Sequence, residues 1–278
     1  MKFFVSADME GIGGITSWDE YEKDYARCRR LFTAEVKAVC EGILASGRKV
    51  DRIVACDAHG PGQNLMIEEL PDVVLLSRGS GRPLMMMDGI DATFDLAFFV
   101  GYHSGVGTRA SLMDHTYSSR SFHRVRVNSV EMDEAMINAA VAGHFGVPVG
   151  FISGDDKLTR RARSEFGPGI LTVTTKYAAS RFAAITRHPD RILKELRAKA
   201  ARAAARAREF KPYRLGKRRP VRLQLEMADT VRADTVALAP GAERVDGRTI
   251  VFRAANMLEL YQTLRLAAVL ALAGGTYL

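Results

Sequence analysis

The chain has 278 residues, of which 47% are hydrophobic and 26% are charged, close to the averages of soluble globular proteins. These values exclude a disordered, collagen-like or coiled-coil protein, and the length predicts one or two domains with a large core. Three cysteines are too few for a disulfide framework or a four-thiolate zinc site, which favours a reducing, cytoplasmic location. We expect no signal peptide and no membrane span, since Asp8 ends the first apolar run and Arg265 interrupts the longest one, 264–272.

The net charge of +8 is concentrated in one segment. Residues 187–219 contain 13 Lys and Arg against three acidic residues, a local balance of +10, so the rest of the chain carries about −2. Apolar residues recur there at helical spacing, which predicts an Ala-rich helix with cations on its other face. Because aromatic residues are nearly absent from this segment, a solvated or subunit-facing helix is favoured over a nucleic-acid-binding one.

Short apolar runs alternate with helical segments over the first 170 residues. Continuous apolar runs predict strands at 3–7, 52–56, 73–76, 96–101 and 147–152, and helices are predicted at 21–45 and about 132–145, with a further strand candidate at 124–130. Uninterrupted apolar runs are typical of strands buried on both faces of a parallel sheet. We therefore expect an α/β domain over residues 1–170, with a mostly parallel sheet sandwiched by helices and carrying the catalytic site.

The pattern changes at about residue 171. After the basic helix, apolar and polar residues alternate over 221–227, which predicts a strand with one wet face. A helix at 230–237, a strand at 249–253 and a long amphipathic helix at 256–272 follow. These elements predict a second, smaller α+β domain over residues 171–278.

Carboxylate and imidazole side chains follow four of the predicted strands. They are Asp8 and Glu10, Asp57 and His59, His103, and Asp155 and Asp156. The carboxyl ends of parallel strands share one edge of a sheet, where ligands bind, so these side chains are expected to converge. Mixed oxygen and nitrogen ligands favour zinc, manganese or cobalt, and their number suits two ions bridged by a carboxylate.

Each residue taken alone has an ordinary structural explanation as well. An Asp after a strand is commonly a helix cap or turn residue, and a single His is commonly structural. His115 lies in a loop, where a catalytic acid, base or nucleophile and an exposed loop histidine are equally consistent with the sequence. The glycines after Glu10 do not complete a dinucleotide fingerprint, because position 16 is Thr.

Several strings in the chain are familiar as a combination. They are Ser6-Ala-Asp-Met-Glu-Gly-Ile-Gly-Gly, Cys56-Asp-Ala-His-Gly, Val100-Gly-Tyr-His, Met113-Asp-His, Asn138-Ala-Ala-Val-Ala-Gly, Ser153-Gly-Asp-Asp and Asn256-Met-Leu-Glu. Together they resemble the D-aminopeptidase family of binuclear zinc metallopeptidases. The resemblance implies five zinc ligands, with the first bridging the ions: Asp8, Glu10, His59, His103 and Glu134. Glu134 rests on the resemblance alone, being four residues before the string that starts at Asn138.

The resemblance also implies an activity. It predicts an aminopeptidase that hydrolyses short peptides with an N-terminal D-amino acid, using two zinc ions, or manganese or cobalt, to polarise the scissile carbonyl. His115 would be the nucleophile or a proton carrier, and water activated by the metals is the alternative. Asp57 is expected to orient a ligand or a loop without binding metal. Ring-shaped homo-oligomers are implied, with a short peptide as the substrate and neither nucleic acid nor membrane as a partner.

Two other functions compete with this interpretation. A two-metal phosphohydrolase could use the same ligands, and a basic chain attracts phosphates. A nucleic-acid-binding protein with a structural metal would bind through the 187–219 helix, in a salt-dependent manner.

Overall fold

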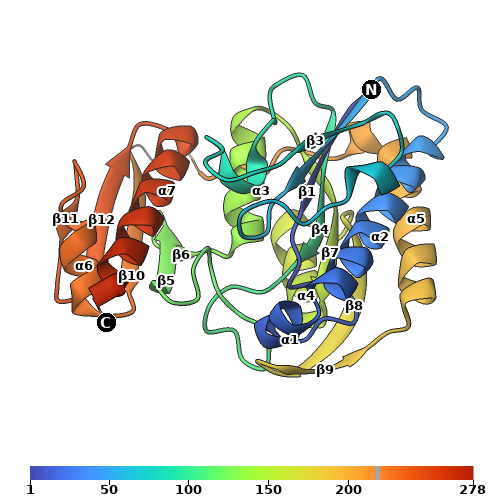
Figure 1. Cartoon of the computed structure of the whole chain (residues 1–278). Helices are drawn as coiled ribbons and strands as arrows, with labels where there is room; N and C mark the ends of the chain where they lie inside the picture. The colour runs from blue at the N-terminus through green and yellow to red at the C-terminus, as the bar shows by residue number, and fades with distance from the viewer. Residues whose placement is uncertain (217–219, 278) are drawn as a thin grey trace.

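The continuous apolar runs form a seven-stranded sheet, sheet A, in a computed structural model that describes residues 1–216 and 220–277 (Figure 1). In spatial order its strands are β3 (Val74–Ser77), β2 (Arg52–Asp57), β1 (Lys2–Ala7), β4 (Leu96–Tyr102), β7 (Val149–Asp155), β8 (Leu171–Ser180) and β9 (Ala183–Thr186). All neighbours are parallel except β8 and β9, which form an antiparallel hairpin. The mostly parallel sheet predicted from the sequence is confirmed.

Helices cover both faces of sheet A. On one face lie α2 (Tyr25–Leu44) and α5 (Pro189–Ala205), which pack against each other and against side chains such as Phe3 and Val5 of β1. On the other lie α3 (Glu134–His144) and α4 (Asp156–Phe166), with Phe4 of β1. Because successive strand residues point to opposite faces, the unbroken apolar runs supply both of these cores.

Two predicted elements differ from the structure. The helix expected over 21–45 is two helices, α1 (Trp18–Lys23) and α2, because the Asp24 side chain accepts a hydrogen bond from the Arg27 N–H and starts a new helix there. The strand expected over 147–152 continues as β7 to Asp155. The Asp155 carboxylate then caps α4, a helix that the sequence pattern did not predict.

A smaller antiparallel sheet, sheet B, lies beside sheet A (Figure 1). Its strands, in order, are β11 (Glu243–Arg244), β12 (Thr249–Ala254), β10 (Val221–Met227), β5 (Phe122–Val127) and β6 (Val130–Glu131). The alternation predicted for 221–227 is confirmed, since every second residue of β10 is buried. The buried face packs against α6 (Thr230–Val236) and α7 (Met257–Gly274). The described residues also form four short 3-10 helices, η1 (Ile67–Glu69), η2 (Met85–Met87), η3 (Ala207–Glu209) and η4 (Gly275–Tyr277).

Strand pairing corrects which segments accompany which sheet. Residues 171–278 were expected to form the smaller unit, but β8 pairs with β7 in sheet A and α5 packs against α2. In exchange, β5 and β6, which precede residue 170, pair in sheet B. Which strands pair decides the sheet that each segment belongs to, and the order of the segments along the chain does not reveal that pairing. The division at 170 thus falls between two strands of one sheet, and the two-domain organisation itself remains a proposal.

The basic segment belongs to the layer beside sheet A. Its predicted apolar stripe is buried, with Ile192, Leu196, Ala200 and Ala203 each 0% exposed. Some of the cations on its other face form ion pairs, including Arg197 with Glu41 of α2. The last three residues of the predicted 187–219 segment, 217–219, lie outside the described residues.

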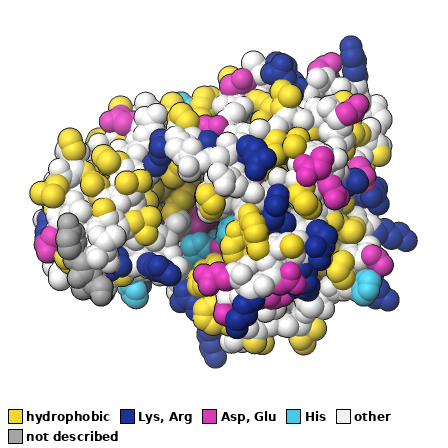
Figure 2. Space-filling view, viewed as in Figure 1, with side chains coloured by type: hydrophobic (Ala, Val, Ile, Leu, Met, Phe, Trp, Pro, Cys, Tyr) yellow, Lys and Arg dark blue, Asp and Glu magenta, His cyan; other side chains and the backbone are white. Residues whose placement is uncertain are grey.

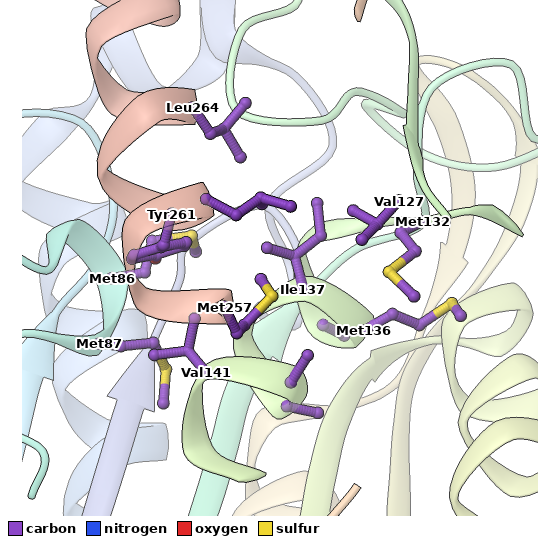
Figure 3. Packing of buried hydrophobic residues seen from close by; sticks show 14 of the residues in the cluster. Met86, Met87, Val127, Met132, Met136, Ile137, Val141, Met257, Tyr261 and Leu264 are labelled. Atoms are coloured by element: carbon purple, nitrogen blue, oxygen red, sulfur yellow. The ribbon is translucent and has the colours of Figure 1, made fainter. Parts of the chain in front are cut away.

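One continuous core joins the two sheets through α3 and α7. Figure 3 shows Tyr261 and Met257 of α7 near Ile137 and Val141 of α3, with the methionines of η2 beside them. By length and composition α7 would qualify as a membrane span, although no span is expected from the sequence there because Arg265 interrupts the apolar run. Its packing against sheet B, α6 and α3 accounts for its buried apolar side chains. The carboxyl edge of sheet A lies next to this junction.

Candidate metal centre

Acidic and histidine side chains meet at the carboxyl edge of sheet A. Asp8 and Glu10 follow β1, His59 follows β2 and His103 follows β4, which are three adjacent strands. Glu134 is the first residue of α3 and points to the same place. Asp8, Glu10, His103 and Glu134 are buried, and their ligand atoms fall into groups lying within 4.8 Å of one another. The predicted convergence of the first three strand ends is therefore present.

Two glycines let the segments after β1 and β4 come close together. The Gly11 N–H donates to the Gly101 carbonyl at 2.7 Å, and Gly101 has φ of +69°. A Cβ on Gly101 would lie 2.1 Å from the Asp8 carbonyl oxygen, and one on Gly11 would lie 1.9 Å from that of Tyr102. Side chains at these positions would separate the segments that carry Asp8 and His103.

The separations between these groups fit metal ligands better than direct hydrogen bonds. Nε2 of His59 is 3.3 Å from Oε1 of Glu10, and Nε2 of His103 is 3.4 Å from Oδ2 of Asp8 and 3.5 Å from Oε1 of Glu134. Charge-assisted hydrogen bonds are shorter, about 2.7–2.9 Å. Ligands about 2.0–2.1 Å from a tetrahedral zinc are separated by about 3.3–3.4 Å.

Three buried atoms of these residues have no hydrogen-bond partner in the described part of the chain: Glu10 Oε2, His59 Nδ1 and His103 Nε2. Buried polar atoms are nearly always satisfied, by protein, water or an ion. The donor set of carboxylate oxygens and imidazole nitrogens is the one that zinc, manganese and cobalt accept. The residues present therefore fit a metal centre.

Neighbouring groups hold the side chains in position. Nδ1 of His103 donates to the Ser104 carbonyl at 3.0 Å, which turns Nε2 toward the carboxylates of Asp8 and Glu134. Trp18 Nε1 donates to Glu10 Oε1 at 2.9 Å, and the Tyr117 backbone N–H donates to Glu134 Oε1 at 2.6 Å. Metal-binding histidines and carboxylates are commonly oriented by outer donors and acceptors of this kind.

Charges within the cluster shift the pKa values strongly. Burial and the charge of Glu10 raise the pKa of Asp8 to about 7. Burial alone would raise the pKa of Glu10, but the charge and hydrogen bond of His59, together with the charges of His115 and His103, outweigh burial and hold that pKa well below its usual value. For His59, burial lowers the pKa, but Glu10 outweighs burial and raises it to about 9. Protons and a metal ion therefore compete for the same atoms.

His115 joins the cluster from the loop between β4 and β5. Its ring stacks on that of His103, with centroids 4.1 Å apart, and Nδ1 donates to the Met113 carbonyl at 2.8 Å. Nε2 faces the acids, 3.6 Å from Glu134 Oε1 and 3.9 Å from Glu10 Oε1. Burial and the charge of His103 lower the pKa of His115. It is not the exposed loop histidine that the sequence left open.

The remaining strand-end acids do not enter the cluster. Asp57 accepts hydrogen bonds from the backbone N–H groups of Asn64 and Leu65, at 2.6 and 2.8 Å, and from the Asn64 amide. The same amide donates to the His59 carbonyl, so Asp57 organises the loop that carries His59. Asp155 caps α4 and also accepts from the Ser111 hydroxyl, and Asp156, the first residue of that helix, accepts from the Ala178 backbone N–H.

Sequence reasoning missed a buried lysine beneath the site. Lys176 of β8 is fully buried, and its Nζ donates to the backbone carbonyls of Glu10, Ile12 and Ile15. Glu35 of α2 completes this support by accepting from the Gly13 N–H at 2.8 Å. Burial lowers the pKa of Lys176 to about 8. A lysine in the middle of a strand pattern was the one available signal, and it does not reveal its partners, which are backbone atoms.

The cluster forms the floor of an open cavity of about 500 Å³ between the two sheets. Figure 2 shows this hollow with histidine and acidic atoms at its bottom and Lys or Arg side chains near its edge. Loops at the carboxyl edge of sheet A, η2 and the helix α7 that packs on sheet B line it, including Arg82, Met86 of η2 and Arg265 of α7. The volume lies in the range of small-molecule sites, about 300–1,000 Å³.

Known proteins resemble this chain along nearly its whole length. The sequence profile of peptidase family M55, D-aminopeptidase, matches residues 1–266. A D-aminopeptidase of Bacillus subtilis strain 168 is 34% identical over 279 residues, covering 98% of both chains. A solved structure, the Zn-dependent D-aminopeptidase DppA from Bacillus subtilis, described as a self-compartmentalizing protease, superposes with a TM-score of 0.92 at 31% identity and 98% coverage of both chains.

Replacing Lys176 by Met should destabilise the protein by about 3–5 kcal/mol, because three carbonyls of the segment after β1 lose a buried charged donor. Urea unfolding of chelator-treated protein measures this. The matched control is Lys23→Met, whose side chain is 74% exposed and whose loss should leave the unfolding midpoint close to that of the wild type. Equal unfolding midpoints for the two variants would contradict the supporting role of Lys176.

Proposed function

The chain belongs to the D-aminopeptidase family, in agreement with the resemblance in its motifs, and on that premise we propose that it is a zinc-dependent aminopeptidase for short peptides with an N-terminal D-amino acid. The observation that carries the proposal is the set of nitrogen–oxygen separations of 3.3–3.5 Å among the clustered side chains, which matches the edge of a zinc coordination shell. Preference for the D configuration rests on the family alone.

We further propose that five residues hold two zinc ions in each chain: Asp8, Glu10, His59, His103 and Glu134. Asp8 lies beside both Glu10 and His103, which suits a carboxylate that bridges the ions. Bound zinc would supply Lewis acidity to the scissile carbonyl. Asp57 acts from outside the ligand set, by fixing the loop that presents His59.

His115 is proposed as the group that handles the proton or attacks the carbonyl. Its Nδ1–H is occupied by the Met113 carbonyl, so the lone pair on Nε2 faces the cavity floor. From there Nε2 can accept a proton from an attacking water and deliver it to the leaving amine, which favours the role of proton carrier. Trp18 packs edge-on against the His115 ring, at 5.6 Å between centroids, and restrains its orientation.

The function test compares D-Ala-D-Ala with L-Ala-L-Ala and with a phosphomonoester, using zinc-reconstituted protein. We expect hydrolysis of the D-peptide alone, and a His115→Ala variant should lose about 100-fold or more in kcat while keeping its zinc. His123→Ala is the matched control, because His123 lies on the exposed face of β5 and should leave kcat unchanged. Phosphatase activity without peptidase activity would support the rival two-metal phosphohydrolase.

We also propose a ring-shaped homo-oligomer in the cytoplasm. The solved relative is described as self-compartmentalizing, and α7 here exposes an apolar row of Leu266, Val269 and Leu272, at 43%, 58% and 52%. Contiguous exposed apolar side chains commonly mark an interface. The three cysteines are free and buried, in keeping with a reducing compartment.

Light scattering tests the assembly. We expect a mass several times the 30.6 kDa of one chain, and Val269→Glu should reduce it, because a charge would be buried in the contact. Glu259→Gln, at the exposed start of the same helix, is the control that leaves the mass unchanged. A wild-type mass of one chain at micromolar concentration would reject the ring.

A further inference from the structure

The cavity above the metal centre has a second set of charges, which are positive. Three arginines line it, Arg82, Arg120 and Arg265. Its lining includes no carboxylates besides Asp8, Glu10 and Glu134, among the residues that the structure describes. None of the three arginines forms an ion pair with those acids, or with any other acid in the described ranges. The cavity thus combines an acidic floor with unneutralised cations.

Two of the arginines are anchored to backbone carbonyls, which leaves their charge uncompensated. Arg82 donates to the carbonyls of Asp57 and Ser77, the first at 2.5 Å. Arg265 of α7 donates to the Gly81 carbonyl at 2.9 Å. This hydrogen bond connects α7, which packs on sheet B, to the loop that carries Arg82. Neutral carbonyls orient a guanidinium without cancelling its field, so both side chains remain attractive to an anion.

Arg120 differs from both, since it has no hydrogen-bond or ion-pair partner anywhere in residues 1–216 and 220–277. It stands at the end of the loop that carries His115, next to Ser118 and Ser119, which also line the cavity. A guanidinium with all five N–H groups available can bind a carboxylate through two parallel hydrogen bonds. Arg120 therefore has the free donors for such a contact.

We propose that these arginines form a subsite for the free C-terminal carboxylate of a short peptide, with Arg120 making the direct contact and Arg82 and Arg265 adding positive potential. The inference rests on the proposed function, because the subsite would bind the C-terminal end of the peptide that the metal centre is proposed to cleave. Two divalent ions would bring +4 to a floor that carries −3 from Asp8, Glu10 and Glu134, so the loaded site would itself be net positive. An anionic substrate end is then favoured over a blocked one.

A subsite of this kind would select substrates by the length of the peptide. A cavity of about 500 Å³ that binds both the N-terminal amino acid and the C-terminal carboxylate accepts peptides of a few residues and discriminates against blocked ones. This selection operates within one chain, whatever assembly the protein forms.

The test compares D-Ala-D-Ala with its C-terminal amide, for the wild type and for Arg120→Gln, Arg120→Lys and Arg109→Gln. The wild type should cleave the free acid with a kcat/KM about 10- to 100-fold above that of the amide, the range for one charged hydrogen-bonded contact. Arg120→Gln should lower kcat/KM for the acid alone, mainly through KM, and bring the ratio near one. Arg120→Lys should restore part of it. Arg109→Gln, in the same loop but away from the cavity lining, should keep the wild-type ratio.

Binding separates this inference from the proposed function. Calorimetry with D-Ala-D-Ala whose peptide bond is replaced by CH2–NH, as acid and as amide, measures carboxylate recognition without turnover. Tighter binding of the acid, lost in Arg120→Gln, supports the subsite even if the protein cleaves neither peptide. Equal binding of acid and amide, or a preference that Arg120→Gln and Arg109→Gln both retain, overturns the subsite while leaving the peptidase proposal intact.

Discussion

The site depends on one electrostatic constraint, the burial of three carboxylates at one edge of a sheet. Asp8, Glu10 and Glu134 are each less than 5% exposed, and carboxylates this close repel one another unless positive charge lies between them. In the protein alone the imidazoles of His59 and His103 provide that charge, which is why their pKa values rise and those of Glu10 and Glu134 fall. Divalent ions would provide it more completely and release the protons. The glycine contacts and the carbonyl-binding lysine keep the carboxylates from separating to relieve this repulsion.

The second sheet is connected to the site by a buried polar hub. Asn138 of α3 donates to the Tyr102 hydroxyl at 2.9 Å, and its carbonyl accepts from the hydroxyls of Tyr117 and Tyr261 at 2.8 Å each. These tyrosines come from β4, the His115 loop and α7, so a single side chain joins sheet A, the His115 loop and the helix of sheet B. Because fully satisfied networks of this kind favour one arrangement, the position of α7, and with it Arg265 at the cavity, follows from the same contacts that orient Glu134.

Much of the site could be predicted from the residues that follow the strands. The rest could not be predicted, and the reasons are physical. Asp8, Glu10, His59 and His103 follow buried runs, and parallel strands bring their carboxyl ends together whatever the intervening chain does. Glu134 follows strands of the other sheet, so only the family resemblance pointed to it. The same rule also placed Asp155 among the converging side chains, but Asp155 caps a helix instead. Lys176 was not identified because it binds backbone carbonyls, which have no sequence signature. The strand β8 was not predicted, and the helix α5 was grouped with the second unit, because local pattern does not encode which strands pair.

The central claim, that this cluster holds two divalent ions with Asp8 between them, is tested most directly by zinc titration. Chelator-treated protein is titrated with zinc in a calorimeter, and bound zinc per chain is verified by elemental analysis after gel filtration. We expect two ions per chain for the wild type, one for His59→Ala and none retained by Asp8→Ala. A wild-type protein that binds no zinc, or an Asp8→Ala variant that still binds two ions, would contradict it.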